Sequence, residues 1–259
     1  MRIVTWNVNS LKVRLPRVLE LLGELAPDVL CLQETKVESA AFPHDELREA
    51  GYAAVDHSGG RWAGVAVLAP LAAPPVEAGR GLPGEPDAQD ARWIEADVAG
   101  IRVISTYVPN GREPASPWFE QKLQFLEAAR ERLATLVPAG PLVIAGDFNI
   151  APEDRDVYDP AAFADSTHVT PEERAAHRAL LATGLRDAYR AVSPDGERYT
   201  WWDYRAGHFH KNLGMRIDHV LLTPDLSARL TACDIARDYR KGSKPSDHAP
   251  LVADLAALS

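Results

Sequence analysis

Polar side chains that could carry out chemistry follow several of the apolar runs of this 259-residue sequence. Strands commonly hold functional groups at their ends, on a rigid scaffold. A single Asp or Asn in such a position is more often a turn former, so the argument rests on the whole set. The set comprises Asn7, Asn9, Glu34, Tyr107, Asp147, Asn149, Asp218, Asp247 and His248.

The residue types in this set suit the hydrolysis of a phosphodiester. Carboxylates and amides, without a cysteine-rich ligand set, favour a hard ion such as Mg²⁺, for which Mn²⁺ can substitute. Such an ion neutralises charge that develops on a phosphate and orients a water. Asp147 and Asn149 form a pair that can hold this water. The sequence contains neither a nucleophile elbow nor a glycine-rich phosphate loop followed by Lys, so we expect no nucleotide cofactor.

The position of Asp218 predicts that it has a partner. Its neighbours Ile217 and Val220 indicate the interior of a strand, where an unpaired carboxylate is costly. An imidazole held by a carboxylate keeps one tautomer and becomes more basic. We therefore expect Asp218 to bind His248, in a pair that can donate to a phosphoryl oxygen.

Short apolar runs predict a protein rich in strands that position these side chains. Helical spacing occurs in Leu15 to Leu25 and in Phe119 to Val137, and Thr170-Pro171-Glu172-Glu173 predicts a capped helix start. The turn at Ala99-Gly100 predicts an antiparallel hairpin, and Ala72 to Gln89 indicates a long surface loop. The candidate strands are Ile3 to Trp6, Val29 to Leu32, Val65 to Leu68, Trp93 to Val98, Ile101 to Tyr107, Leu142 to Ala145, Tyr199 to Trp202, Ile217 to Leu222 and Leu251 to Leu255.

The order of these elements favours one catalytic domain over residues 1–259. Hairpins and helical segments are mixed along the chain, and no linker with a change of composition divides it. We expect an α+β fold, a four-layer αββα sandwich of two packed, mainly antiparallel sheets flanked by helices.

The charge of the chain is acidic overall, but basic residues gather in three places. The net charge of −9 argues against a general polyanion-binding protein. Basic clusters at residues 12–17, 205–216 and 237–244 nevertheless lie near the polar set, and they indicate a rim that faces phosphates. We expect no membrane span and no secretory signal. Cys31 and Cys233 are expected to be reduced thiols of a cytoplasmic protein.

Five segments together resemble the endonuclease/exonuclease/phosphatase superfamily, and within it the branch of exodeoxyribonuclease III and the abasic-site endonucleases. They extend over almost the whole chain and are specific as a group. The segments are Pro27 to Lys36 (PDVLCLQETK), Tyr107 to Asn110 (YVPN), Gly146 to Asn149 (GDFN), Asn212 to Asp218 (NLGMRID) and Ser246 to Pro250 (SDHAP).

The resemblance implies a magnesium-dependent DNA repair nuclease with 3′–5′ exonuclease activity on duplex DNA and incision 5′ to abasic sites. It implies that Glu34 binds the metal near Asn7 and Asn9, with Asp247 supporting the metal or His248. It further implies that Asp147 and Asn149 position the water, with Asp147 also serving as base or acid. By the same resemblance, Tyr107 and His248, which Asp218 orients, are expected to stabilise the phosphate. The partner implied is double-stranded DNA with abasic sites or 3′ ends, bound by a monomer.

Aromatic and basic residues extend this resemblance to the DNA contacts. In relatives, aromatic residues near Trp201 form a pocket for the sugar without a base, and we expect Trp201 in the pocket and Trp202 in the core. Some relatives carry Asp where this chain has Asn9, and some carry Trp where it has Met215, a flexible side chain that offers no rigid wall. The predicted DNA contacts are Asn110, Arg112, Trp201, Arg205, Lys211, Met215, Arg216 and Lys241.

Two other functions remain open at this point. A hydrolase of phospholipid head groups or phosphoinositides belongs to the same superfamily, although the aromatic and basic segment from Trp201 to Lys211 argues against it. A DNA-binding protein without catalysis would be expected to lack at least one of Glu34, Asp147, Asp218 or His248, and this chain has them all. The balance between abasic-site incision and 3′ exonuclease action stays open, as do the preferred metal and the number of metal sites.

Overall fold

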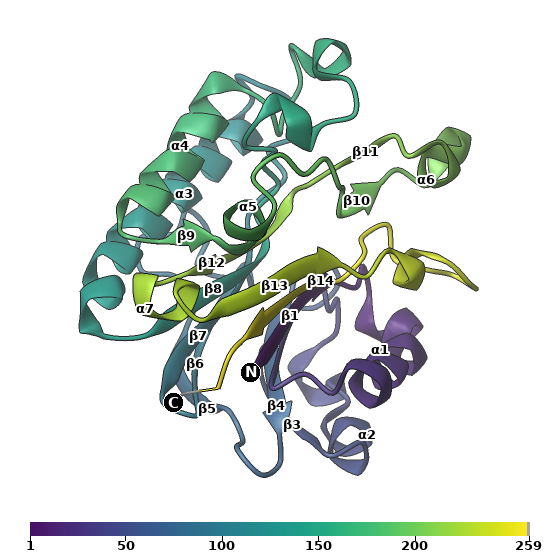
Figure 1. Cartoon of the computed structure of the whole chain (residues 1–259), viewed down its shortest axis with the longest axis vertical. Coiled ribbons are helices and arrows are strands. Elements are labelled where there is room, and N and C mark those ends of the chain that lie inside the picture. The colour runs from purple at the N-terminus through teal and green to yellow at the C-terminus, as the bar shows by residue number, and fades with distance from the viewer. Residues whose placement is uncertain (258–259) are drawn as a thin grey trace.

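Two six-stranded sheets form the centre of the protein in the computed structural model, which describes residues 1–257 (Figure 1). Among these residues, no helix has the length and apolar character needed to cross a membrane. The first sheet has the order β13 (Leu230–Ile235), β14 (Leu251–Leu255), β1 (Arg2–Asn7), β2 (Val29–Gln33), β4 (Val65–Pro70) and β3 (Tyr52–His57). The second has the order β5 (Val76–Arg80), β6 (Trp93–Val98), β7 (Ile101–Tyr107), β8 (Leu142–Asp147), β12 (Asp218–Leu222) and β9 (Arg186–Asp187).

Helices cover the outer face of each sheet, so the protein has the four layers that the sequence predicted. Helices α1 (Leu11–Leu25) and α2 (His44–Glu49) lie on the first sheet, and α3 (Pro117–Leu136) and α4 (Pro171–Ala182) lie on the second (Figure 1). Most strand pairs are antiparallel; the pairs β1–β2 and β7–β8 are parallel. The remaining short elements are β10 (Trp201–Trp202), β11 (Gly214–Met215), α5 (Ala188–Val192), α6 (His208–Lys211) and α7 (Pro224–Ser227).

Three apolar clusters hold the layers together. The central cluster lies between the sheets, where residues such as Val29 and Val67 of the first sheet meet Val103 and Val143 of the second. A second cluster joins the first sheet to α1 and α2, and a third joins the second sheet to α3 and α4. Alternate residues of one strand therefore enter different clusters, as the two-residue period of a strand requires. This packing fixes the position of one sheet edge relative to the other.

Local signals placed α4 correctly but missed the edge strands of both sheets, β13 and β3 in the first and β5 and β9 in the second. The hydroxyl of Thr170 accepts a hydrogen bond from the backbone N–H of Glu173, and the carboxylate of Glu173 accepts one from the backbone N–H of Thr170. The predicted capping box is therefore confirmed. The prediction of a long loop from Ala72 to Gln89 is wrong, because β5 lies within it. This strand lies at the edge of its sheet and is largely exposed, so it lacks the alternation of apolar and polar residues that identifies a strand buried on one face.

Strand register brings polar side chains of the second sheet to one edge. Tyr107 lies opposite Asp147 in the parallel pair β7–β8, and Asp218 lies opposite Asp147 in the antiparallel pair β12–β8. Gly146 allows this close pairing, because a Cβ atom there would lie 1.9 Å from the carbonyl oxygen of Thr106. Three of the predicted site residues are therefore neighbours at the end of one sheet.

His177 on α4 generates a prediction about stability in acid. Burial, with the nearby His219, lowers its pKa to about 3 despite the opposing effect of Asp187. Between this value and the ordinary pKa of histidine, the unfolded chain binds a proton that the folded protein excludes. The contribution of His177 to the free energy of unfolding is therefore fully present above pH 6.5. Between pH 6.5 and pH 3 it decreases by about 1.4 kcal/mol per pH unit.

We expect His177→Phe to remove this loss. Chemical denaturation of both proteins at pH 7, 6, 5 and 4 should show a shallower decline of the unfolding free energy in the variant. Parallel declines over this range would contradict the assignment.

Candidate active site

The ends of strands from both sheets meet at one edge of the molecule, where the polar set lies. Asn7 ends β1, Glu34 follows β2, Asp147 ends β8 and Asp218 begins β12. His248 lies just before β14. Ligand atoms of Glu34, Asp147 and His248 all lie within 4.8 Å of one another. Residues separated by more than 200 positions thus form one cluster.

The bond predicted between Asp218 and His248 is present and buried. Nδ1 of His248 lies 2.8 Å from Oδ2 of Asp218, and its Nε2 lies 3.7 Å from Oδ2 of Asp147. Burial alone would lower the pKa of His248, but Asp218, Asp147 and Asp247 outweigh burial and raise it to about 10. The imidazole is therefore a protonated donor at neutral pH, with Nε2 directed toward the cluster.

Asn7 joins the two carboxylates that face this imidazole. Its Nδ2 donates to Oε1 of Glu34 at 2.7 Å and to Oδ2 of Asp147 at 2.9 Å. Burial, together with Asp218 and Glu34, raises the pKa of Asp147 to about 7, against the opposing effect of His248. An acceptor in this range can take a proton from water near neutral pH.

The same carboxylates fit a divalent cation. Negative charge is concentrated on a nearly buried Asp147 beside Glu34, and a cation held by these oxygens would offset it. Asn9 lies outside this cluster, since its Nδ2 donates to Asp247 at 3.0 Å and its Oδ1 accepts from Lys36 at 2.7 Å. The described residues therefore group Glu34, Asp147 and His248, with Asn7 bridging, and leave Asn9 paired with Asp247.

Tyr107 and Asn149 border the cluster from the second sheet. Burial, with Glu34 and Asp147, raises the pKa of Tyr107 well above its usual value, so its hydroxyl remains a donor. The backbone N–H of Asn149 donates to Oδ1 of Asp147 at 2.9 Å. The amide of Asn149 accepts from Asn110 at 3.3 Å and donates to the carbonyl of Val108 at 2.9 Å. Asn149 thereby fixes the orientation of Asp147.

Trp201 also reaches the site, while Trp202 belongs to the core as expected. The indole Nε1 of Trp201 donates to Oδ2 of Asp247 at 3.1 Å, and its side chain is partly exposed. Trp202 is fully buried. Of the predicted DNA contacts, Asn110, Arg112, Arg205, Lys211 and Lys241 are exposed.

The prediction that Arg216 contacts DNA is wrong. Its side chain is fully buried, and its guanidinium donates to Asp156, to Asp187 and to Nδ1 of His219. A buried guanidinium needs such partners, which the sequence signal for a basic cluster does not show. Met215 is also buried, at 1% exposure, and pairs across β10–β11 with Trp201. It supports Trp201 and has almost no surface for a direct contact.

Sequence reasoning missed a buried ion pair beneath the loops that carry Asn110 and Asn149. Lys122 of α3 is fully buried, and its Nζ donates to the carbonyls of Asn149 at 2.7 Å and Asn110 at 3.2 Å. It also pairs with Glu173 of α4. Burial lowers the pKa of Lys122, and Glu173 opposes this shift. The helical spacing of α3 marked this position as part of a helix, but no local signal distinguishes a buried Lys from an exposed one.

His168 is a second residue that the sequence did not single out. Its Nδ1 donates to the carbonyl of Asn149 at 2.6 Å. Burial and the charge of Lys122 lower the pKa of His168 to about 4, so the ring is neutral near pH 7. It has φ of 81°, and Asn149 has φ of 52°. Non-glycine residues rarely adopt this conformation, and it concentrates at functional sites.

The fold and this site agree with comparisons to known proteins. A model of the endonuclease/exonuclease/phosphatase family matches residues 4–248, and the chain belongs to this family. It is 32% identical to exodeoxyribonuclease III of Haemophilus influenzae, over 98% of this chain and 99% of the relative.

Two solved structures have nearly the same fold. One is the 3′ phosphatase NExo from Neisseria, bound to a product DNA hairpin; it is 41% identical, with a TM-score of 0.96 over 99% of this chain and 100% of that one. The other is an AP endonuclease from Archaeoglobus fulgidus; it is 38% identical, with a TM-score of 0.95 over 99% of this chain and 100% of that one.

We expect the buried pair of Lys122 and Glu173 to hold the loops of Asn110 and Asn149 in position, and this role can be tested by mutation. The double variant Lys122→Met/Glu173→Gln removes both charges, so that neither is left unpaired in the interior. We expect kcat to fall about 10- to 100-fold, because small displacements of catalytic groups are costly, while KM changes little. Turnover is measured where circular dichroism shows the variant folded.

Arg130→Met on the same helix is the matched control. Arg130 lies on the surface and pairs with Glu127, so its loss should leave turnover near normal. A folded double variant with the kcat of the control would contradict the positioning role.

Proposed function

We propose that this protein is a magnesium-dependent DNA repair nuclease that acts as a monomer through one catalytic domain. Its substrates are duplex DNA with 3′ ends, from which it removes nucleotides in the 3′–5′ direction, and duplex DNA with abasic sites, which it incises on the 5′ side. The observation that carries the proposal is the cluster of Glu34, Asp147 and His248 at an edge bordered by basic residues. The names of the similar proteins support the same reading.

The mechanism follows from which groups hold protons. Mg²⁺, held by Glu34 with Asn7 beside it, would neutralise charge on the scissile phosphate. Asp147, fixed by Asn7 and by the N–H of Asn149, accepts a proton from the attacking water. His248, kept protonated by Asp218, donates toward the phosphoryl oxygen. Donors that are already oriented toward developing charge usually make the largest contribution to catalysis.

Tyr107 and Asp247 complete this arrangement from two sides. The hydroxyl of Tyr107 stays protonated and can donate to a second phosphate oxygen. Asp247 orients Trp201 and Asn9 through its two carboxylate oxygens. In the proposal, Trp201 forms a wall of the site that accepts the sugar next to the scissile bond.

A basic groove offers a path for the DNA backbone. It contains Arg14 and Arg17 of α1 together with Lys241 and Lys244, so two of the basic clusters seen in the sequence meet there. Arg14 donates to the carbonyl of Asn9, which places the groove next to the site. Neutralisation of phosphates by such residues gives affinity without sequence preference.

The proposal includes a location in the cytoplasm. Cys31 and Cys233 are free and buried, and burial raises the pKa of the Cys31 thiol to about 12. Unpaired cysteines suit the reducing cytoplasm, and we propose that the protein acts there.

Three labelled duplexes test the proposed function. One carries an abasic-site analogue, one a recessed 3′ hydroxyl end and one a 3′ phosphate, and each is incubated with Mg²⁺, Mn²⁺ or chelator. We expect cleavage that depends on the metal and stops with chelator, and the ratio of initial rates ranks the activities. Glu34→Gln should lower kcat/KM at least about 10-fold, with partial rescue by more metal.

Glu38→Gln is the matched control, because Glu38 follows the same strand but is exposed. Its rates should match those of the unmodified protein. Failure of the folded protein to cleave any duplex in either metal, together with hydrolysis of phosphoinositides, would replace the proposal with the lipid alternative.

A further inference from the structure

A hollow of about 340 Å³ lies between α6 and the loop over residues 241–245, and it is distinct from the basic groove beside α1. Lys241, Gly242 and Pro245 line both, so this loop forms a ridge between the hollow and the groove. In Figure 1 the loop is the yellow segment with α6 on one side and α1 on the other. No step of the proposed mechanism uses this space, which we name the α6 hollow.

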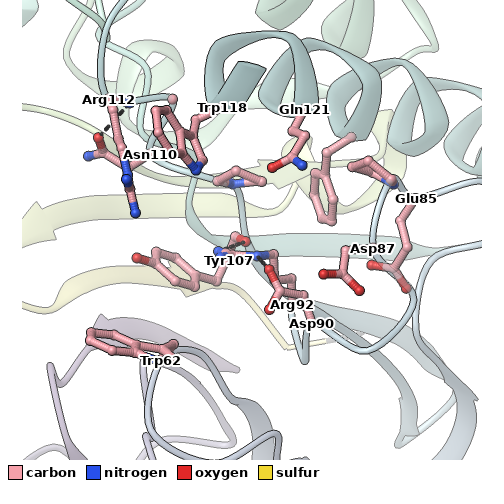
Figure 2. Close-up of a pocket in the computed structure, with 14 residues that line it drawn as sticks. Trp62, Glu85, Asp87, Asp90, Arg92, Tyr107, Asn110, Arg112, Trp118 and Gln121 are labelled. Carbon is pink, nitrogen blue, oxygen red and sulfur yellow. Dashed lines mark hydrogen bonds and ion pairs between the residues drawn. The ribbon is translucent and has the colours of Figure 1, made fainter. Parts of the chain in front are cut away.

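Charge distinguishes the α6 hollow from a larger hollow of about 410 Å³ beside Tyr107. The lining of the larger hollow has three carboxylates against two guanidinium groups, and Figure 2 shows Glu85 and Asp87 at one end. The lining of the α6 hollow has two cations, Arg240 and Lys241, against one carboxylate. The α6 hollow is therefore the better place for an anion.

The one acid in the lining of the α6 hollow is already neutralised. Asp203 accepts from Nε and Nη2 of Arg205 at distances from 2.6 to 3.1 Å. Lys241, in contrast, pairs with Asp238 on the surface, where both side chains are more than half exposed. Surface ion pairs of this kind are weak, so the ammonium can turn toward a ligand. The charge that a ligand meets is therefore positive.

Arg240 is buried without a carboxylate partner in the part of the chain that the structure describes. It is 7% exposed, and its Nη2 donates to the carbonyl of Trp202 at 3.3 Å. Its guanidinium lies 4.9 Å from the ring centre of Tyr204 and 5.2 Å from that of Phe209. Arg216, which is also buried, has carboxylate oxygens at 2.7 and 2.8 Å. Since buried charges are normally paired, Arg240 is held ready for a negative charge that the fold does not supply.

One nitrogen of this guanidinium is available to a ligand. Nη1 of Arg240 has no hydrogen-bond partner among residues 1–257, and it is not closed off as Nε is. Burial lowers the pKa of Arg240, while Tyr204 and Asp247 oppose this shift and Arg14 adds to it. Arginine nevertheless stays protonated at neutral pH. An anion that accepts from Nη1 would therefore offset the cost of the buried charge.

Tyr204 connects Arg240 to the candidate active site. Its hydroxyl accepts from Arg14 at 3.0 Å, and Arg14 also donates to the carbonyl of Asn9. Asn9 in turn donates to Asp247 at 3.0 Å. A ligand group bound at Arg240 therefore has a fixed position relative to the site.

We propose that the α6 hollow binds one phosphate of the DNA backbone, held by Nη1 of Arg240 and by the ammonium of Lys241. The inference rests on the proposed nuclease function and adds a contact outside its basic groove. The rings of Tyr204 and Phe209 keep the guanidinium in place, so binding costs little conformational entropy. Such a contact sets the register of the duplex on the protein without reading its sequence.

The ridge favours DNA over an acidic peptide as the occupant. Its residues 241–244 are exposed and place Lys241 and Lys244 between the hollow and the groove. A duplex carries phosphates at regular spacing along both strands, so one molecule can occupy both spaces. The phosphate comes either from the reacting strand or from its complement, and a substitution series separates these sources.

Methylphosphonate substitution tests for this phosphate. In a duplex with a recessed 3′ end, one phosphodiester at a time, on either strand, is replaced by a neutral methylphosphonate. Binding is measured by fluorescence anisotropy in chelator at fixed salt, so that no duplex is cleaved. For the unmodified protein we expect affinity to fall about 10-fold where the phosphate meets Arg240, as for a hydrogen bond between charged groups. The strand that carries this position identifies the source.

Arg240→Met assigns the position to one side chain. The variant should bind the natural duplex about 10-fold more weakly and show no further loss at that one methylphosphonate. Its losses at the other positions should stay the same, because non-additivity marks a direct pair. Arg240→Lys keeps a cation in the interior and should regain part of the affinity.

Arg237→Met controls for a loss of packing. Arg237 belongs to the same short 3₁₀ helix (Arg237–Arg240) and lies 4.1 Å from the ring centre of Phe209, but it lines a different hollow. The variant should keep the full effect of the methylphosphonate at the position assigned to Arg240. Circular dichroism checks that each variant is folded, and Arg240→Lys serves as the comparison where Arg240→Met is not.

Additive losses at every position in the Arg240 variants, or affinities equal to those of the unmodified protein, would overturn the inference and leave Arg240 a packing role. Cleavage of the natural duplex in Mg²⁺ tests the proposed function separately. Binding with the expected non-additivity but without cleavage would keep the phosphate site and remove the nuclease. Failure of the unmodified protein to bind any duplex would remove both.

Discussion

The bond between Asp218 and His248 is the constraint on which the rest of the site depends, because its two partners belong to different sheets. Asp218 begins β12 of the second sheet, and His248 precedes β14 of the first. Asn7 makes a second connection of the same kind, from β1 to Asp147 of β8. The cluster exists only when the central core holds both sheets in register, so stability and function share the same packing.

Buried ion pairs beneath the candidate site support the strand ends and loops that form it. Arg216 is neutralised by Asp156 and Asp187, and it also donates to Nδ1 of His219. Nε2 of His219 then donates to the carbonyl of Ile150 at 2.9 Å, in the loop that follows β8. Lys122 holds the preceding residue, Asn149, in the same way. These networks fix the loop that carries the candidate catalytic groups. Removal of one partner would leave a buried charge unpaired, so substitutions within them should be poorly tolerated.

The sequence predicted the parts of the fold and site that have local signals. The cap at Thr170 and the apolar strands are encoded by residues close together in the sequence. The need of Asp218 for a partner likewise followed from its neighbours alone. The roles of Glu34, Tyr107 and Asn149 required the resemblance to a family, because an Asn or Glu after a strand has many uses. Long-range pairing could not be read from the chain: Arg216 looked like a basic surface residue, Lys122 like an ordinary helix residue, and β5 like a loop. For Arg216 and Lys122 the deciding partners lie far away in the sequence. β5 lacks the alternation of a half-buried strand because it is an exposed edge strand.

The central claim is that Asp218 keeps His248 protonated at the meeting point of the two sheets. It is tested most directly by the titration of histidine side chains in ¹⁵N-labelled, metal-free protein followed by nuclear magnetic resonance, alongside the Asp218→Asn variant. The account predicts a pKa of about 10 for His248 and a clear decrease in the variant, which keeps the shape of Asp218 without its charge. A His248 that titrates near 6.5 in the unmodified protein, or an equal pKa in both proteins, would contradict it.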